Sequence, residues 1–124
     1  MRHAIWVGIF AALLFGTPGA LAGDGQERLN KEVRHLIQFV TESGCDFIRN
    51  GKTHTPAQAV EHINKKYAYF EAEIDSAEKF IELSATQSTL TGQKYTIRCP
   101  GQPVLESRAW LLRELDTFRK KDAR

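Results

Sequence analysis

The chain has 124 residues, of which 42% are hydrophobic and 26% charged, and its formal net charge at pH 7 is +2. This length suits one small domain with a modest hydrophobic core, and no repeat or linker divides it. Because the charges nearly balance, the sequence predicts no nucleic-acid partner.

Residues 1–22 have the pattern of a secretory leader. A short basic start precedes an apolar run over residues 4–15, and Ala20-Leu21-Ala22 forms a small-x-small cleavage site. The run is shorter than the roughly 20 apolar residues that a membrane-spanning helix needs. We therefore predict that residues 1–22 are a cleaved signal peptide and that residues 23–124 form a single small helix-rich domain. An uncleaved N-terminal anchor is the alternative.

Export has consequences for charge and location. Arg2 would leave with the leader, so 16 basic and 15 acidic residues would remain, with a net charge of +1. Asp24 stands where a lipoprotein signal would place cysteine, which argues against a lipid anchor. We expect a periplasmic or secreted protein without an integral membrane segment in its mature chain.

The first helix is predicted from near Glu27 to the Ser43-Gly44 pair, where glycine can accept the left-handed conformation that ends helices. Its apolar residues at helical spacing are Leu29, Val33, Leu36, Ile37 and Val40.

Asn50-Gly51 then predicts a hairpin, because a type I′ turn needs positive φ at both of its central positions. The flanking strands would be residues 46–49 and 52–54. Alternatively, the first helix continues to Asn50 and Gly51 caps it.

Thr55-Pro56 starts a second helix, with threonine as N-cap and proline at the first helical position. The helical spacing of apolar residues continues to about Ser84, so one long helix is possible. However, Asp75-Ser76-Ala77-Glu78 resembles a capping box in which Glu78 reaches back to the Asp75 amide. This pattern favours a break and a separate short third helix.

The last part of the chain predicts a strand and a helix. "KYTIRC" alternates, with Tyr95, Ile97 and Cys99 on one face. A final helix is predicted from about Ser107, with an apolar face formed by Trp110, Leu111, Leu115 and Phe118. The expected fold is helix-rich α+β: three to four helices on a small antiparallel sheet of two to three strands.

Cys45 and Cys99 are the only two cysteines. In an oxidising compartment, an even cysteine count in a small domain favours a disulfide, and only one intramolecular pairing exists. There is no Cys-x-x-Cys motif and no histidine nearby in sequence. Reduced core cysteines or a catalytic thiol are the alternatives.

Three stretches, "CDFIRNGKTHTPAQAVEHI", "IDSAEKFIELSATQSTLTGQKYTIRCPG" and "WLLREL", resemble the YfeK-like family of small, secreted, uncharacterised bacterial proteins. Phe-Ile-Arg-Asn-Gly and Ser-Ala-Glu-x-Phe-Ile are the most specific parts, and the resemblance covers nearly all of the chain beyond the leader. It implies an exported single domain of unknown function and supplies no catalytic residues.

Motifs for catalysis or metal binding are absent from the sequence. His35, His54 and His62 lack the i, i+4 spacing of a helical zinc site, and no Gly-x-Ser-x-Gly elbow occurs. Acidic residues share one helix face, where solvent and a lysine account for them: Glu71, Asp75, Glu78 and Glu82. We predict no catalytic residue, metal or cofactor.

The candidate binding residues are basic and lie in or next to the predicted strands: Arg49, Lys52, Lys94 and Arg98. If the hairpin and the late strand are neighbours, Arg49 and Arg98 come together and, with Lys52, could bind an acidic group. The alternatives are an internal partner such as Asp46 or Glu106, or charges that protect a sheet edge.

The sequence thus favours a non-enzymatic binding or interaction module of the bacterial envelope, whose partner would be an envelope protein. Two alternatives remain open. One is an inhibitor of an envelope or wall-degrading enzyme, which "TGQKY" suggests by a loose likeness to the loop of some lysozyme inhibitors. The other is an enzyme with an unrecognised site.

Overall fold

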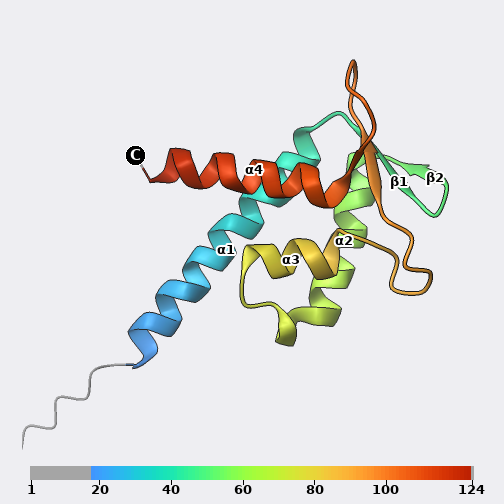
Figure 1. Cartoon of the computed structure of the whole chain (residues 1–124). Helices are drawn as coiled ribbons and strands as arrows, with labels where there is room; N and C mark the ends of the chain where they lie inside the picture. The colour runs from blue at the N-terminus through green and yellow to red at the C-terminus, as the bar shows by residue number, and fades with distance from the viewer. Residues whose placement is uncertain (1–17, 124) are drawn as a thin grey trace, which may run out of the picture.

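The computed structural model describes residues 18–123 (Figure 1). The elements are α1 (Pro18–Glu42), β1 (Asp46–Arg49), β2 (Lys52–His54), α2 (Pro56–Phe70), the 3-10 turn η1 (Glu71–Glu73), α3 (Ala77–Ser84), β3 (Thr96–Arg98), β4 (Leu105–Glu106) and α4 (Ser107–Asp122). The helix-rich α+β class is confirmed.

The N-terminal part of the fold differs from the sequence expectation. α1 begins at Pro18 rather than near Glu27. Most of the predicted leader, residues 1–22, lies outside the described residues, so its cleavage stays a prediction. Among the helices of residues 18–123, none combines the length and the apolar character that crossing a membrane requires.

The sheet is antiparallel, with strand order β2-β1-β3-β4. Four strands form where two or three were predicted. The missed strand is β4, whose two residues pair with β3. Two residues are too few to show the alternation by which a strand is recognised in sequence.

The hairpin between β1 and β2 is confirmed. Asn50 and Gly51 both have positive φ, of 48° and 76°, as a type I′ turn requires. The alternative of a longer first helix is wrong, because α1 ends at Glu42 and Gly44 takes φ 65° just after it.

Residues 56–84 form two helices, as the sequence favoured. Thr55 caps α2 with a capping box, in which its Oγ1 accepts from the Gln58 amide and its own amide donates to the Gln58 side chain. α2 ends at Phe70, η1 follows, and α3 begins after a second cap.

The predicted cap of α3 is wrong by one residue. Ser76 is the N-cap, and its Oγ accepts from the Lys79 amide at 3.1 Å. Glu78 does not reach back to Asp75, because its carboxylate accepts two hydrogen bonds from Arg119 instead. The contact with Arg119 joins two charged groups through two parallel hydrogen bonds, whereas the predicted cap would join the carboxylate to one uncharged amide.

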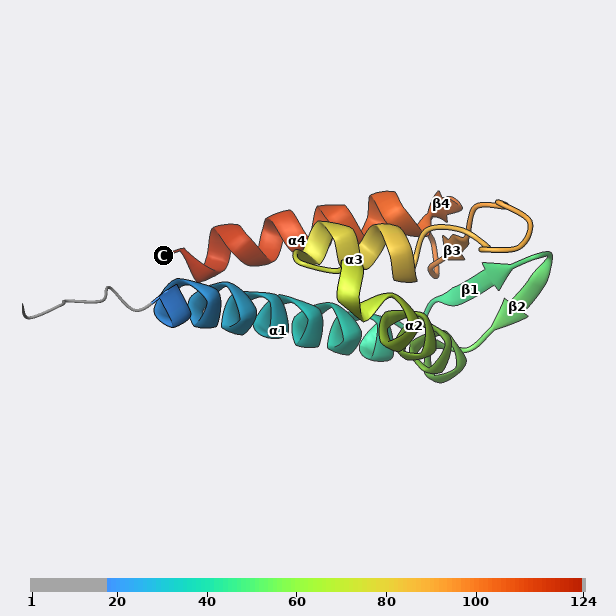
Figure 2. The same cartoon turned by 90° about the horizontal axis from the view of Figure 1, so that it is seen from below.

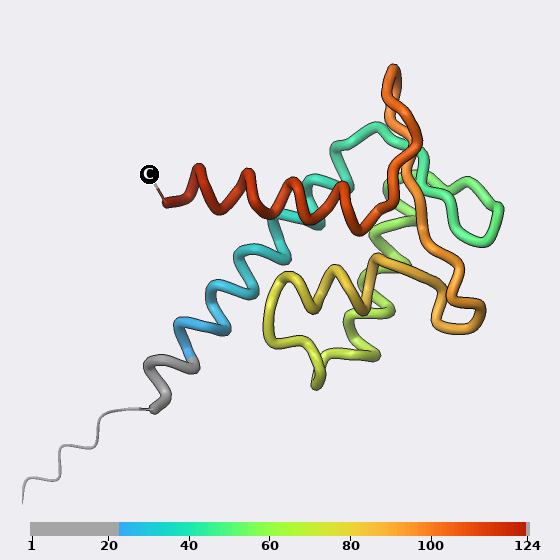
Figure 3. Tube along the Cα trace, viewed as in Figure 1, coloured from blue at the N-terminus to red at the C-terminus, as the bar shows by residue number. Residues whose placement is uncertain are grey.

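The helices pack together, and the sheet lies at one end of them (Figures 1 and 2). α1 packs against α2, α3 and α4. The C-terminus lies far from the sheet (Figure 3), and there Lys31 of α1 pairs with Asp122 at 2.7 Å. The largest fully buried apolar side chains come from α1, α3, β3 and α4: Phe80, Leu36, Ile81, Ile97, Leu111, Leu115 and Val40.

A disulfide joins Cys45, just before β1, to Cys99, just after β3, across a sequence separation of 54 residues. Cys45 is buried in the core and Cys99 packs against it. The predicted pairing is therefore present in the structure, and it holds together the ends of two neighbouring strands that hydrogen bonds already align.

Candidate binding site

The sheet register separates the two arginines that the sequence placed together. Arg98 lies opposite Asp46 in the β1–β3 pair, and its guanidinium donates to the Asp46 carboxylate at 3.0 Å. Arg49 lies three residues further along β1, and successive side chains of a strand point to opposite faces. The expected approach of Arg49 to Arg98 is therefore wrong, and the alternative of an internal partner for Arg98, Asp46, is confirmed.

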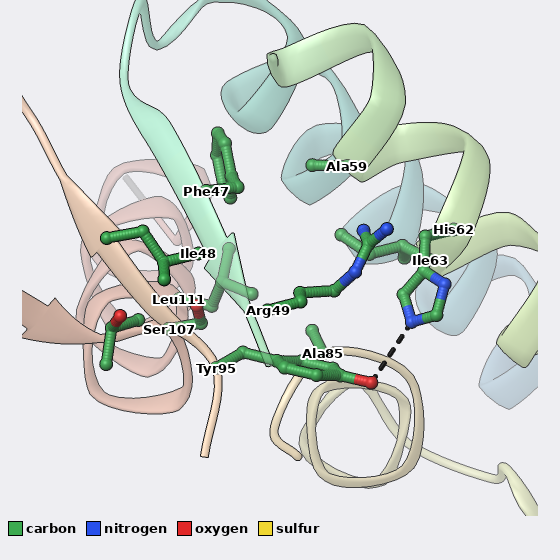
Figure 4. A pocket seen from close by; sticks show the side chains of 11 residues that line it. Phe47, Ile48, Arg49, Ala59, His62, Ile63, Ala85, Tyr95, Ser107 and Leu111 are labelled. Carbon is green, nitrogen blue, oxygen red and sulfur yellow. Dashed lines mark hydrogen bonds between the residues drawn. The ribbon is translucent and has the colours of Figure 1, made fainter. Parts of the chain in front are cut away.

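Arg49 faces the helices (Figure 4). Its side chain lines a pocket between the sheet, α2 and the start of α4, next to His62 of α2 and Tyr95 just before β3. The other walls of this pocket are mainly apolar and include Phe47, Ala59, Ile63, Ala85 and Leu111. The polar groups of Arg49, His62 and Tyr95 are thus gathered on one side of an otherwise apolar space.

The Tyr95 hydroxyl connects two residues of α2. It lies 3.1 Å from Nε2 of His62, and Nζ of Lys66 donates to it at 3.4 Å. The Lys66 ammonium also lies 5.1 Å from the centroid of the Tyr95 ring. His62 and Lys66 are four residues apart, so one face of α2 presents both. With His62 neutral, the tyrosine can donate to the imidazole and accept from the lysine.

The electrostatics of this group reflect burial and crowded positive charge. Burial lowers the pKa of His62 to about 4, with further lowering by the charges of Arg49 and Lys66. Burial, and then Arg49, also lower the pKa of Lys66. Within residues 18–123, no carboxylate lies at ion-pair distance from Arg49, His62 or Lys66. Among residues 18–123, the two cations of this group, Arg49 and Lys66, therefore have no carboxylate partner, and the imidazole between them is neutral at neutral pH.

Two solvent-open hollows flank this group. The hairpin hollow is lined by Arg49, His54, Gln58, Glu61, His62 and Lys65. The loop hollow lies between α2, α3 and the loop that follows α3, and its charged residues are Lys66, Glu82, Lys94 and Arg108. We call the surface that carries both hollows the basic face.

The structure places three of the four predicted binding residues on or beside the basic face. Arg49 lines the hairpin hollow, Lys94 lines the loop hollow, and Lys52 pairs with Arg49 across the β1–β2 ladder. Arg98 lies on the opposite face of the sheet with Asp46.

Sequence reasoning missed four contributors to the basic face: His62, Lys66, Tyr95 and Arg108. Only one signal could have indicated them, namely the i, i+4 spacing of His62 and Lys66. Elsewhere in the described chain, His35 contacts Glu114 at 2.6 Å and stacks on Phe118. Residues 18–123 contain no cluster of three or more potential metal ligands.

Comparison with known proteins places the chain in a family. Residues 27–119 match the model of a family of unknown function, DUF5329. The chain belongs to this family. It is also 34% identical over 70 residues to the uncharacterized protein YfeK of Salmonella typhimurium strain LT2. That match covers 56% of this chain and 56% of the relative, so the chain spans about half the length of the curated relative.

The resemblance seen in the sequence is therefore confirmed for this member of the DUF5329 family. No solved structure matches the chain significantly. All six residues that line the hairpin hollow, and all nine that line the loop hollow, fall inside the range that the family model matches.

Proposed function

We propose that this chain is an exported, non-enzymatic binding module that captures an acidic group of an envelope protein on its basic face. The observation that carries the proposal is the group of Arg49, His62 and Lys66 around Tyr95, without a carboxylate partner in the described part of the chain. Desolvated cations that lack a counter-ion favour an external anion, because it relieves their mutual repulsion.

Arginine is suited to this role because its planar guanidinium can bind a carboxylate through two parallel hydrogen bonds. Arg49 is half-buried, so such a contact would be screened less by water than one at the open surface. Burial raises the pKa of Tyr95, so the phenol is protonated at neutral pH and can donate a hydrogen bond to His62.

Export is proposed from two observations. The first is the leader pattern in residues 1–22, and the second is the Cys45–Cys99 disulfide, a bond that persists in oxidising compartments. The intact mass of the protein from an envelope extract tests this part. We expect an N-terminus within a residue or two of Gly23, and a retained Met1 or a lipid adduct would contradict it.

Binding is tested by exchanging one arginine on each face of the same sheet. Arg49→Gln removes a cation of the basic face, whereas Arg98→Gln removes the same charge from the opposite face. Each variant serves as bait in a pull-down from envelope extract, after both are shown to melt like the wild type. We expect partner recovery to fall with Arg49→Gln, to persist with Arg98→Gln, and to fall for the wild type as salt rises. Equal recovery by all three proteins would end the proposal.

A further inference from the structure

The two hollows of the basic face are lined by residues of α2 that lie one helical turn apart. His62 lines the hairpin hollow and Lys66 lines the loop hollow, and both contact the Tyr95 oxygen, at 3.1 and 3.4 Å. The hollows are therefore neighbours along α2, and one ligand can reach from one to the other.

The loop hollow has its own cations that lack carboxylate partners. Lys66 donates to the Gln87 carbonyl at 2.7 Å, and Lys94 donates to Oε1 of the Gln87 side chain at 3.0 Å. Both ammonium groups are thus held by neutral oxygens of a single residue. Arg108 also forms no ion pair with another described residue, and Glu82 pairs outward with Lys79 at 3.7 Å. This arrangement provides a second anion subsite beside the first.

We propose that the two hollows together bind one extended acidic peptide segment whose carboxylates stand at alternate positions, in the pattern Glu-x-Glu or Asp-x-Asp. The inference rests on the proposed function and specifies its ligand. Arg49 would hold one carboxylate in the hairpin hollow, and Lys66, Lys94 and Arg108 would hold the other.

The spacing of the subsites favours alternate positions. His62 and Lys66 are four residues apart on α2, which separates them by about 6 Å along the helix axis. In an extended peptide, residues i and i+2 point to the same side and lie about 6.6 Å apart. Adjacent residues point to opposite sides, and residues three apart also do so at about 10 Å. The alternate pattern therefore matches the separation of the two α2 residues, His62 and Lys66, that line the hollows.

A peptide fits the hollows better than a phosphate polymer or an anionic membrane. Glu61 lines the hairpin hollow and Glu82 lines the loop hollow, so each subsite contains a carboxylate that repels dense negative charge. Peptide N–H groups can donate to these carboxylates, whereas a phosphate ester has no hydrogen to donate at neutral pH. Each hollow thus combines cations with a carboxylate acceptor, which suits a peptide that carries both carboxylates and N–H donors.

The experiment compares three labelled isomeric peptides of Gly, Ser and two Glu residues, with blocked ends and equal charge, by fluorescence anisotropy at low salt. The glutamates are adjacent, alternate or three apart, and a fourth peptide carries one glutamate. We expect the alternate isomer to bind about fivefold or more tightly than the other two, which corresponds to about 1 kcal/mol of additional contact. Equal binding of the three isomers would overturn the proposal.

Variants separate this inference from the proposed function. Lys94→Gln and Arg108→Gln should each remove the preference for the alternate isomer, because each removes a cation that would hold the second carboxylate. Lys94→Arg, which keeps the charge, should restore the preference. Arg49→Gln should weaken all four peptides. If Arg49→Gln weakens binding while neither loop-hollow variant alters the preference, the second subsite is wrong and the first stands.

Competition tests the chemistry of the ligand. Unlabelled tripolyphosphate and vesicles containing phosphatidylglycerol are added to the complex of wild-type protein with the alternate peptide. We expect both to compete more weakly than the unlabelled peptide at equal total negative charge. Stronger competition by tripolyphosphate would assign the face to phosphate polymers, and stronger competition by vesicles would assign it to a membrane surface. Either result would overturn the peptide proposal.

Discussion

Arg49 controls the electrostatics of the basic face. Its charge contributes to the lowered pKa values of His54, His62 and Lys66, after burial in each case. Burial also lowers the pKa of Arg49 itself, although a guanidinium stays charged at any pH the cell meets. Burial, and then the fixed charge of Arg49, therefore keep His62 neutral at neutral pH.

The neutral state of His62 predicts how stability depends on pH. The unfolded histidine takes a proton near pH 6.5, but the folded one does so only near pH 4. In this window the unfolded state binds more protons, so the stability of the folded state falls as the pH falls from about 6.5 to about 4. Burial contributes most to the lowered pKa of His62, and the positive charges of four neighbours add to it: Arg49, Lys66, His54 and Lys65.

Urea midpoints between pH 7 and pH 4.5 measure this effect. His62→Gln should flatten the decline, and Arg49→Gln should reduce it, because the remaining charges repel the imidazolium less. The measurements stay above pH 4.5 to avoid the titration of Glu78. The hydrogen bond from Arg119 lowers the pKa of this carboxyl to about 2, so its contribution to stability is lost as the pH falls from about 4.5 to about 2. Parallel curves for wild type and His62→Gln would contradict the prediction.

At the level of the helices, one arginine joins three elements. Arg119 of α4 donates to both oxygens of Glu32 in α1, at 2.7 and 2.9 Å. It also donates to both oxygens of Glu78 in α3, at 2.8 Å each. The Glu32 side chain is only 6% exposed, whereas that of Glu78 is 52% exposed. The two ion pairs therefore differ in how much water screens them.

This difference predicts unequal costs of substitution. Arg119→Gln leaves the Glu32 carboxylate buried without its bidentate partner, and we expect a loss of about 2–3 kcal/mol in the free energy of unfolding. Arg28, which lies 3.7 Å from Glu32, is mostly exposed and replaces little of the contact. Glu78→Gln removes only the solvated pair and should cost less than about 1 kcal/mol. Urea unfolding of both variants measures the two values, and equal losses would contradict this assignment.

At the level of the whole molecule, the disulfide joins the ends of two neighbouring strands, at points 54 residues apart in sequence. Cys45 follows the end of α1, and Cys99 ends the strand that leads towards α4. The closed loop contains the hairpin, α2 and α3, which is half of the described fold. Closing a loop of this length restricts the unfolded chain by about 4 kcal/mol in the chain-entropy estimate.

We expect Cys99→Ala to lower the free energy of unfolding by about 2–4 kcal/mol, since native strain and residual structure reduce the entropic gain. Urea unfolding with and without a reductant checks this. The reductant should lower the midpoint of the wild type to near that of the variant and leave the variant unchanged. Two free thiols in oxidised wild-type protein would show instead that the bond does not form in solution.

The sequence by itself determined the features that depend on a few adjacent residues. Thr55-Pro56 predicted the start of α2 because a cap acts within one helical turn. Asn50-Gly51 predicted the hairpin because positive φ is a property of the two residues themselves. The disulfide followed from the cysteine count, which left a single pairing. The break before α3 was also predicted, although its capping residue was not.

Only the tertiary structure decided which side chains face one another. The β1–β3 register placed Arg98 with Asp46 and turned Arg49 towards α2, and no local pattern encodes a pairing across about 50 residues. Likewise, Tyr95 meets His62 and Lys66 only because the β3 segment packs beside α2. The short strand β4 exists only because β3 offers it a partner. Contacts between distant segments depend on the packing of the whole core, so the basic face could not be predicted from any local stretch of the sequence.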